Sequence, residues 1–394
     1  MRSLPLIFRK SSLGASMNHA VRISAAAFLV LVSLSSRAQT PPANYTLAFS
    51  DNLDASVLDP SKWNYRTDGK YLSAQLPANV VEGGGYVSIN LAQQSFAGYS
   101  WTGGGIVSKN SFRYGYYQVK AKISANPGWH TSFWVIAGDG TTTFPPAAKT
   151  EIDGFEINTD NPSSISMGTE EWDNGSNVGG TRCNSSYNPG FSTAASYHYY
   201  GFEWTESGIT YYIDGTPVCT QSYPASSWTH DPVNIWLTSI GYTSDISVAD
   251  NPSPNSFADV AYYVRDYYVN ALEPGYAEYG PGWTNSTLTG FSSLPTRYSD
   301  STGAIAQWTP TILATGNYDV QVWKVQYSSS DPAAPFTVHY SGGSHTTTVN
   351  CATGSSGWVD LGTFAFAAGS AGNVTMGYSG TGVARTSMVK FVRQ

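Results

Sequence analysis

Three carboxylates occur within six residues in the segment EIDGFE at positions 151–156. Side chains of a regular strand alternate between its faces, so Glu151 and Asp153 would share one face and Glu156 would point to the other. One extra residue at Gly154, forming a β-bulge, would correct the register, because glycine tolerates the left-handed backbone that a bulge can require. We therefore predict that all three acids face the same side of the strand.

Three neighbouring carboxylates are unfavourable in a purely structural strand, because each raises the pKa of the others. Glycoside hydrolysis uses such a cluster: one carboxylate attacks, a protonated one donates to the leaving oxygen, and retaining enzymes hold the two about 5 to 5.5 Å apart. Asp153 lies between the glutamates, where it could share a proton and keep one of them protonated. The alternative is an exposed edge strand whose acids prevent aggregation. Apolar residues on the opposite face, Ile152, Phe155 and Ile157, favour a packed strand instead.

The elements that would position these acids are short strands. Aromatic residues make up 14% of the 394-residue chain, and 39 Gly and 21 Pro supply turns. β-branched and aromatic residues recur at period two in five runs, at 113–123, 131–136, 208–213, 233–240 and 260–269. No window of about a dozen residues has apolar side chains at the spacing of an α-helix. We predict an all-β fold, with one large antiparallel sandwich over residues 45–272.

A second, smaller all-β sandwich is predicted for residues 276–394. The turn-forming segment Glu273-Pro274-Gly275 marks the boundary between the two predicted domains. Beyond it, strand-like runs at 318–325 and 336–340 alternate with turn clusters at 328–335 and 341–344.

Aromatic residues near the acids are candidates for contacts with a sugar. Trp134 lies on the preceding strand-like run and shares a face with His130 by period-two counting. An indole ring beside the acids suits the apolar face of a sugar. His130 is read either as a substrate contact or as a structural polar residue. Trp101, Trp129 and Trp172 are further candidates on expected loops.

The segment from Leu47 to Tyr268 resembles glycoside hydrolase family 16, in the branch with the bulged E-x-D-x-x-E motif. The matching pieces are LDPSKW from Leu58, GGGIVSKNSFRYGYYQVKAKI from Gly103, TSFWV from Thr131, EIDGFE from Glu151, YHYYGFEWTESGITYYIDG from Tyr197 and AYYVRDYY from Ala261. The resemblance implies a concanavalin-like β-jelly-roll with Trp134 in the cleft. It also implies that Glu151 is the nucleophile, Asp153 the assisting acid and Glu156 the acid/base.

We therefore expect a retaining endo-glycosidase that hydrolyses internal β-glycosidic bonds of a β-glucan or β-galactan by double displacement. The β-1,3-glucanase members of the family usually show Trp-Pro shortly before the nucleophile, where this chain has Phe144-Pro145-Pro146, so the sequence does not name the sugar. The alternative is a non-catalytic polysaccharide-binding lectin of the same jelly-roll shape. The presence of all three acids, Glu151, Asp153 and Glu156, favours the enzyme, because their mutual repulsion destabilises the fold and sugar binding alone does not require it.

The C-terminal part resembles the golvesin C-terminal and xanthan-lyase-type binding domain. The resemblance rests on the segments WTP at 308–310, GNYDV at 316–320 and GWVDLGTF at 357–364. It implies carbohydrate binding by residues 276–394. The alternative is a spacer domain, because a fold does not by itself establish a function.

Residues 1–38 read as a secretory signal peptide. Basic residues precede an apolar run at 25–34, small residues follow it, and no acid occurs before Asp51. A membrane anchor is the alternative, but the run is shorter than the roughly 18 residues that a span needs. We expect a secreted, periplasmic or extracellular monomer that leaves the membrane on cleavage and has a polysaccharide as its partner.

The charge of the chain argues against nucleic-acid binding. It has 20 basic and 27 acidic residues, and removing residues 1–38 takes away five cations and no anion, leaving 15 against 27, a net charge of -12. Such a balance lacks the cation surplus that phosphate binding needs. It also disfavours a heavily sulfated or uronic substrate.

The chain has three cysteines, and in an exported protein Cys183 and Cys219 are expected to form a disulfide across 36 residues. The alternative is that both remain free thiols. Cys351 has no expected partner. No metal or cofactor is expected, because the chain has no H-E-x-x-H motif and no Cys/His cluster.

Overall fold

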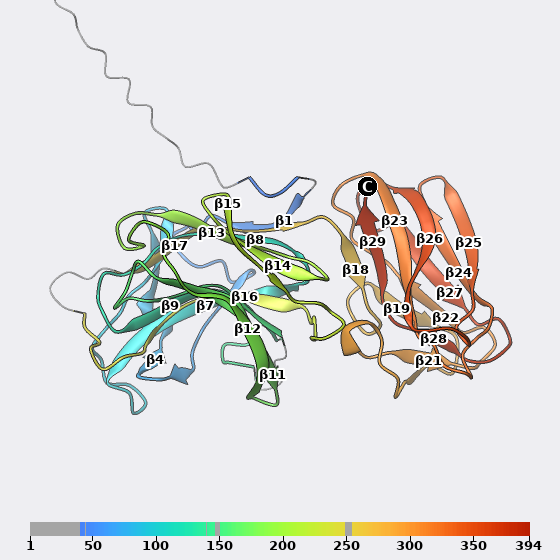
Figure 1. Ribbon diagram of the computed structural model, residues 1–394, viewed down its shortest axis with the longest axis horizontal. Helices are drawn as coiled ribbons and strands as arrows, with labels where there is room; N and C mark the ends of the chain where they lie inside the picture. The colour runs from blue at the N-terminus through green and yellow to red at the C-terminus, as the bar shows by residue number, and fades with distance from the viewer. Residues whose placement is uncertain (1–39, 44, 139, 146–149, 249–253) are drawn as a thin grey trace, which may run out of the picture. The chain divides into compact units, whose positions relative to one another are not determined.

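The computed structural model describes residues 40–43, 45–138, 140–145, 150–248 and 254–394 (Figure 1). The predicted signal peptide lies outside the described residues. No helix in the described part of the chain is long and apolar enough to cross a bilayer.

Two large sheets are built from residues 46–264. The first has eight strands among the described residues, ordered β15 (Thr216–Ser222), β14 (Gly208–Ile213), β13 (His198–Trp204), β8 (Gly115–Lys122), β17 (Asn255–Val264), β6 (Tyr86–Ile89) and β5 (Val80–Gly83), with β1 (Thr46–Asp51) paired to β17. The second has nine, ordered β12 (Ser176–Tyr187), β11 (Ile165–Asp173), β10 (Thr150–Asn158), β9 (Trp129–Ala137), β16 (Val233–Gly241), β7 (Trp101–Phe112), β4 (Ser73–Gln75) and β3 (Gly69–Lys70), with β2 (Trp63–Tyr65) paired to β7. A short 3₁₀ turn, η1 (Pro77–Asn79), precedes β5.

The two sheets pack face to face through apolar side chains. From the second sheet, Phe155 lies 4.7 Å from Tyr200 and Phe133 lies 5.6 Å from Phe202 of the first, between ring centroids. Ile152, like these residues, is buried in the same core. The period-two pattern therefore places the apolar side of β10 inside the sandwich, and the prediction of an all-β jelly-roll sandwich is confirmed.

The C-terminal residues form three smaller sheets, and a second 3₁₀ turn, η2 (Phe291–Ser293), lies among them. The four-stranded sheet runs β18 (Tyr267–Val269), β29 (Val389–Arg393), β23 (Gly316–Lys324), β26 (Gly357–Phe366). The five-stranded sheet runs β19 (Tyr276–Tyr279), β22 (Ile305–Trp308), β27 (Asn373–Gly377), β24 (Ala334–Tyr340), β25 (Gly343–Val349). The three-stranded sheet runs β20 (Thr284–Asn285), β21 (Arg297–Ser299), β28 (Ala384–Thr386).

One expected strand divides between these sheets. The run 260–269 is split at Arg265 and Asp266, so that β17 ends at Val264 in the first large sheet and β18 pairs with β29. The adjacent arginine and aspartate form an ion pair at 2.6 Å, in the bend that redirects the chain. The chain thus changes sheets several residues before the Glu273-Pro274-Gly275 segment.

A disulfide joins Cys183 of β12 to Cys219 of β15. These are the edge strands of the two large sheets, so the bond ties the sheets together at one side of the sandwich. Cys351 is free and buried.

Candidate active site

The bulge predicted in β10 is present. On the β11 side, Asp153 pairs with Gly168 and Glu156 pairs with Ser166. Three residue steps along β10 therefore correspond to two steps along β11. On the β9 side, the same irregularity lies between Asp153 and Phe155. The extra residue brings Glu156 onto the face of β10 that carries the other two acids, and all three line one cleft.

The reason for glycine at position 154 differs from the expected one. Its backbone does not adopt a positive φ. A Cβ atom there would instead lie 2.8 Å from the ring of Phe133 and 3.0 Å from that of Phe202. The core on the inner side of the bulge has no room for a side chain, so packing rather than backbone freedom selects glycine.

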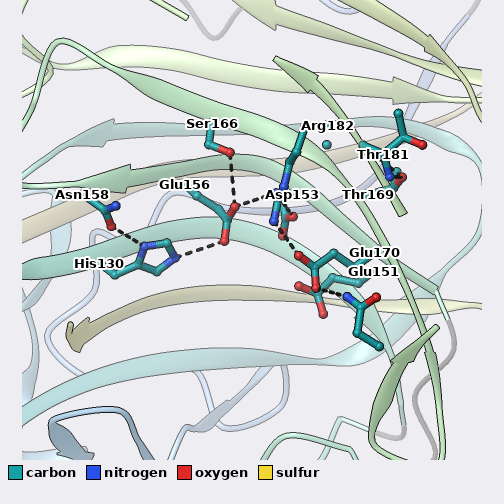
Figure 2. A network of polar contacts seen from close by, with 12 residues as sticks. His130, Glu151, Asp153, Glu156, Asn158, Ser166, Thr169, Glu170, Thr181 and Arg182 are labelled. Carbon is teal, nitrogen blue, oxygen red and sulfur yellow. Dashed lines mark hydrogen bonds and ion pairs between the residues drawn. The ribbon is translucent and has the colours of Figure 1, made fainter. Parts of the chain in front are cut away.

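The donors around the acids come from β9, β11 and β12, and Figure 2 shows His130, Ser166 and Arg182 among them. Trp172 donates its indole N–H to Oε2 of Glu151 at 2.7 Å. Arg182 donates from Nη1 to Oδ2 of Asp153 at 2.5 Å and to Oε2 of Glu156 at 2.6 Å. A single guanidinium nitrogen therefore joins two of the three acids.

Glu156 has further contacts on both of its oxygens. Nε2 of His130 lies 3.1 Å from Oε1, and the Ser166 hydroxyl donates to Oε2 at 3.5 Å. The other ring nitrogen of His130, Nδ1, lies 2.7 Å from Oδ1 of Asn158, which accepts its proton. A hydrogen bond between His130 and Glu156 then needs a second proton, carried either by the imidazole or by the carboxyl group.

The three acids have different ionisation environments. Burial raises the pKa of Glu151 to about 8, and the charges of Glu170 and Glu156 add to the effect. Burial, with the charges of Glu156 and Glu151, also raises the pKa of Asp153 well above its ordinary range, against the lowering effect of Arg182. For Glu156, burial acts upward, but the contacts with His130, Arg182 and Ser166 outweigh it and bring the pKa below its usual value.

The acids line a cleft with a volume of about 420 Å³. Trp134 lines it as well, and its indole N–H donates to the Thr238 hydroxyl at 3.0 Å. The ring of Phe144 lies 6.3 Å from that of Trp134 and 5.1 Å from that of Trp172. The cleft thus combines carboxylates with an aromatic wall.

The structure separates the five aromatic and histidine candidates. His130, Trp134 and Trp172 line the cleft. The prediction that Trp129 contacts substrate is corrected: its side chain has no exposed surface, and its indole N–H donates to the Ser247 carbonyl. Trp101 packs edge-on against Trp129 and is not among the residues that line the cleft. Trp101, Trp129 and Trp172 all lie on regular strands rather than on the expected loops.

Sequence reasoning missed Arg182 and Glu170. Arg182 lies 29 residues beyond Asp153 in the sequence, but Gly168 pairs with both of them, on opposite sides of β11. A Cβ atom at Gly168 would lie 2.8 Å from Cδ of Arg182, so the glycine leaves the path along which the guanidinium crosses to the acids. The only signal in the sequence was a glycine in a strand, which marks a close approach without naming its partner.

Within the described residues, no group of three or more His, Cys, Asp or Glu side chains is arranged to hold a metal ion. The positive charge in contact with Asp153 and Glu156 comes from Arg182, a side chain of the chain itself.

A jelly-roll sandwich with a carboxylate cluster and an aromatic wall in one cleft defines a carbohydrate-active class of protein. Comparison with protein families agrees. Residues 73–244 match the family model Glycosyl hydrolases family 16, and residues 273–393 match the Golvesin C-terminal domain. The family matches therefore confirm both predicted resemblances, to glycosyl hydrolases family 16 and to the Golvesin C-terminal domain.

Two curated relatives illustrate the similarity. Endo-1,3-1,4-beta-glycanase EglC of Rhizobium meliloti is 25% identical over 181 residues, which is 44% of this chain and 36% of the relative. A beta-glucanase of Acetivibrio thermocellus is 25% identical over 228 residues, 57% of this chain and 63% of the relative. The chain therefore spans less than two thirds of the length of either protein.

Solved structures similar to part of this chain include porphyranase B from Zobellia galactanivorans. It is 17% identical, with a TM-score of 0.49 over 57% of this chain and 98% of that one. SCLam, a non-specific endo-beta-1,3(4)-glucanase, is 21% identical, with a TM-score of 0.48 over 57% of this chain and 93% of that one.

Proposed function

We propose that this protein is a retaining, endo-acting glycoside hydrolase that cleaves internal β-glycosidic bonds of a β-glucan or β-galactan. The observation that carries the proposal is the arrangement of Glu151, Asp153 and Glu156 on one face of a bulged strand, in a cleft and in unequal ionisation environments. Two carboxyl groups with different proton affinities are what acid and nucleophile roles require.

In this mechanism Glu151 attacks the anomeric carbon while Glu156 donates its proton to the leaving glycosidic oxygen, giving a covalent glycosyl-enzyme. Glu156 then takes a proton from water, whose oxygen displaces Glu151 and restores the original anomeric configuration. Trp172 stabilises the ionised form of Glu151 through its indole N–H. Asp153, between the two glutamates and almost fully buried, is placed to hold the proton that they exchange.

The productive state needs an ionised Glu151 and a protonated Glu156. The surroundings of the two groups favour the opposite distribution, because burial keeps a proton at Glu151 and the contacts with His130 and Arg182 favour the ionised form of Glu156. A proton must therefore move toward Glu156 when substrate fills the cleft. The coupled acids then titrate together, and their apparent pKa values belong to the cluster.

The aromatic wall formed by Trp134, Phe144 and Trp172 supports a saccharide as the ligand, since apolar sugar faces stack on aromatic rings. Relatives named as beta-glucanases support a β-glucan within this class. A β-galactan is the second possibility. We also propose that residues 1–38 direct export to the place where such polymers occur, that the mature chain acts as a monomer, and that residues 276–394 bind polysaccharide.

The test is a panel of laminarin, lichenan, agarose and carrageenan, with release of reducing ends as the readout and Glu151→Gln as the inactive variant. Glu278→Gln, a change in the C-terminal sheets, is the matched control and should retain activity. Proton NMR of the first products should show the β-anomer before mutarotation. Binding without release of reducing ends from any of these polymers or from related galactans would contradict the enzyme and favour a lectin.

For the C-terminal residues, the full chain carrying both Glu151→Gln and Trp134→Ala is the suitable probe, because it impairs the cleft without removing a domain. Retained sedimentation with insoluble polysaccharide is expected if residues 276–394 bind sugar. Complete loss of sedimentation would assign all binding to the cleft.

A further inference from the structure

We propose that Arg182 is a positioning residue that holds the acids in a resting arrangement and must withdraw from Glu156 before a glycosidic bond is cleaved. This inference rests on the proposed function and assigns a regulatory step to the same site. It concerns a residue that does not belong to the acid motif and that comes from an edge strand two strands away.

The contacts of Arg182 occupy the position where a proton would have to be shared. Nη1 lies between Oδ2 of Asp153 and Oε2 of Glu156, at 2.5 and 2.6 Å, and Nη2 contacts Oε1 of Glu170 at 2.6 Å. A guanidinium remains charged at any ordinary pH and does not act as a proton donor in exchange. While it stays there, Asp153 and Glu156 are bridged by a fixed cation instead of a mobile proton.

The same contacts are incompatible with a general acid. Oε2 of Glu156 accepts from Arg182, and Oε1 faces His130. A protonated Glu156 must direct an O–H group at the leaving oxygen of the substrate. A proton on Oε2 would face the N–H of Arg182, so this oxygen can act as the acid only once the guanidinium has moved away.

The position of Arg182 in the fold allows such a movement. Its strand, β12, is an edge strand, and its side chain is 32% exposed, whereas that of Asp153 is 2% exposed. Gly168 leaves the path of the side chain open. Glu170 provides a second anchor, because its other oxygen accepts from Nδ2 of Asn177 at 2.7 Å. Arg182 can therefore leave Glu156 while it keeps its ion pair with Glu170.

The resting contact also has a physical reason. Glu151, Asp153, Glu156 and Glu170 place four carboxyl groups around one cleft, and in the empty site a cation shared among three of them reduces their mutual repulsion. A sugar ring that enters the cleft displaces water and competes for Oε2 of Glu156, which is the atom that Arg182 occupies. Substrate binding and release of the acid are then a single event.

The test compares Arg182→Met and Arg182→Lys with the native chain. The matched control is Arg297→Met, which removes another arginine paired with a carboxylate, Glu278, in the C-terminal sheets. The pH profile of kcat/KM reports groups of the free protein, and that of kcat reports the complex. We expect Arg182→Met to move the acid limb of kcat/KM upward by about 1 to 3 pH units, the usual influence of a close opposite charge.

The acid limb of kcat should move much less, because Arg182 has already withdrawn in the complex. Arg182→Lys should give an intermediate shift, because one ammonium group cannot contact three carboxylates at once, and the control should give none. Equal shifts in both profiles would overturn the withdrawal. A loss of thermal stability with both profiles unchanged would reduce Arg182 to a structural residue.

A second readout needs no turnover. The carboxyl carbon of Glu156 can be followed by ¹³C NMR during an acid titration of the ¹³C-Glu-labelled full chain, with Glu156→Gln to assign its signal. We expect the signal to titrate at higher pH in Arg182→Met and Arg182→Lys than in the native chain. An unchanged titration would overturn the inference. A shifted titration in a chain that hydrolyses no polysaccharide would instead contradict the proposed function alone.

Discussion

Replacing Glu151 by glutamine should stabilise the fold at neutral pH while it abolishes hydrolysis. The ordinary pKa of this carboxyl group is 4.5, and burial, with the charges of Glu170 and Glu156, raises it to about 8. The folded state thus holds the proton more tightly than the unfolded state. The stability contributed by Glu151 is fully present below pH 4.5 and is lost as the pH rises toward 8.

The size of the effect follows from these two values. At about 1.4 kcal/mol per pH unit, the interval from 4.5 to about 8 corresponds to a loss of about 3 kcal/mol at pH 7 and of about 4 kcal/mol at pH 8, where the group is half ionised in the folded state. Glutamine keeps the shape of the side chain and cannot ionise. Its amide oxygen can still accept the hydrogen bond from Trp172.

The assay is urea unfolding followed by tryptophan fluorescence, repeated from pH 4.5 to 8. Glu151→Gln and the native chain should have similar free energies of unfolding near pH 4.5 and diverge as the pH rises, with the variant more stable. Equal free energies of unfolding at pH 7 would refute the reasoning, because they would mean that an ionised Glu151 is not unfavourable in this cleft.

Glu278→Gln is the control of opposite sign. Burial acts upward on the pKa of Glu278, but the hydrogen bonds from Arg297 and Tyr276 outweigh it and lower the pKa. Its contribution to stability is therefore present above the ordinary pKa and lost as the pH falls. This variant should be less stable than the native chain at neutral pH.

Three further outcomes are expected. Gly154→Ala should lower the free energy of unfolding by about 1 to 3 kcal/mol, measured by calorimetry, because its Cβ would meet a buried phenylalanine ring at 2.8 Å; an unchanged melting temperature would show that the ring yields. Replacing Cys183 and Cys219 together by serine should lower the free energy of unfolding by about 4 kcal/mol, which is the chain-entropy contribution of a disulfide that closes a 36-residue loop. Urea unfolding midpoints equal to those of the native chain would contradict this expectation. Trp172→Phe should lower kcat at least about tenfold on any polymer that the native chain hydrolyses. A hydrogen bond to a charged acceptor contributes about 1.5 to 3 kcal/mol, and the bond from Trp172 supports the ionised form of Glu151. An unaltered kcat would show that the indole N–H does not assist the nucleophile.

Local sequence patterns predicted much of the fold, because each side chain of a β-strand points to one of only two faces of the sheet. Period-two counting placed Trp134, in the run 131–136, on one face with His130, which precedes that run, and both line the cleft. The same counting placed the acids of β10 together once one extra residue was allowed at Gly154. Trp129 was expected on a loop, where this counting does not apply, and it lies buried at the start of β9 instead.

The sequence by itself determined the strands, the acid motif with its bulge and the face that the acids share, since these depend on residues that are neighbours along the chain. The tertiary structure alone decided the state of the acids. Arg182 of β12 reaches them across β11, and Glu170 lies on β11, through pairings that no local pattern specifies. Proton affinity depends on burial and on charges a few ångströms away in space, so only the folded chain sets Glu151 and Glu156 apart.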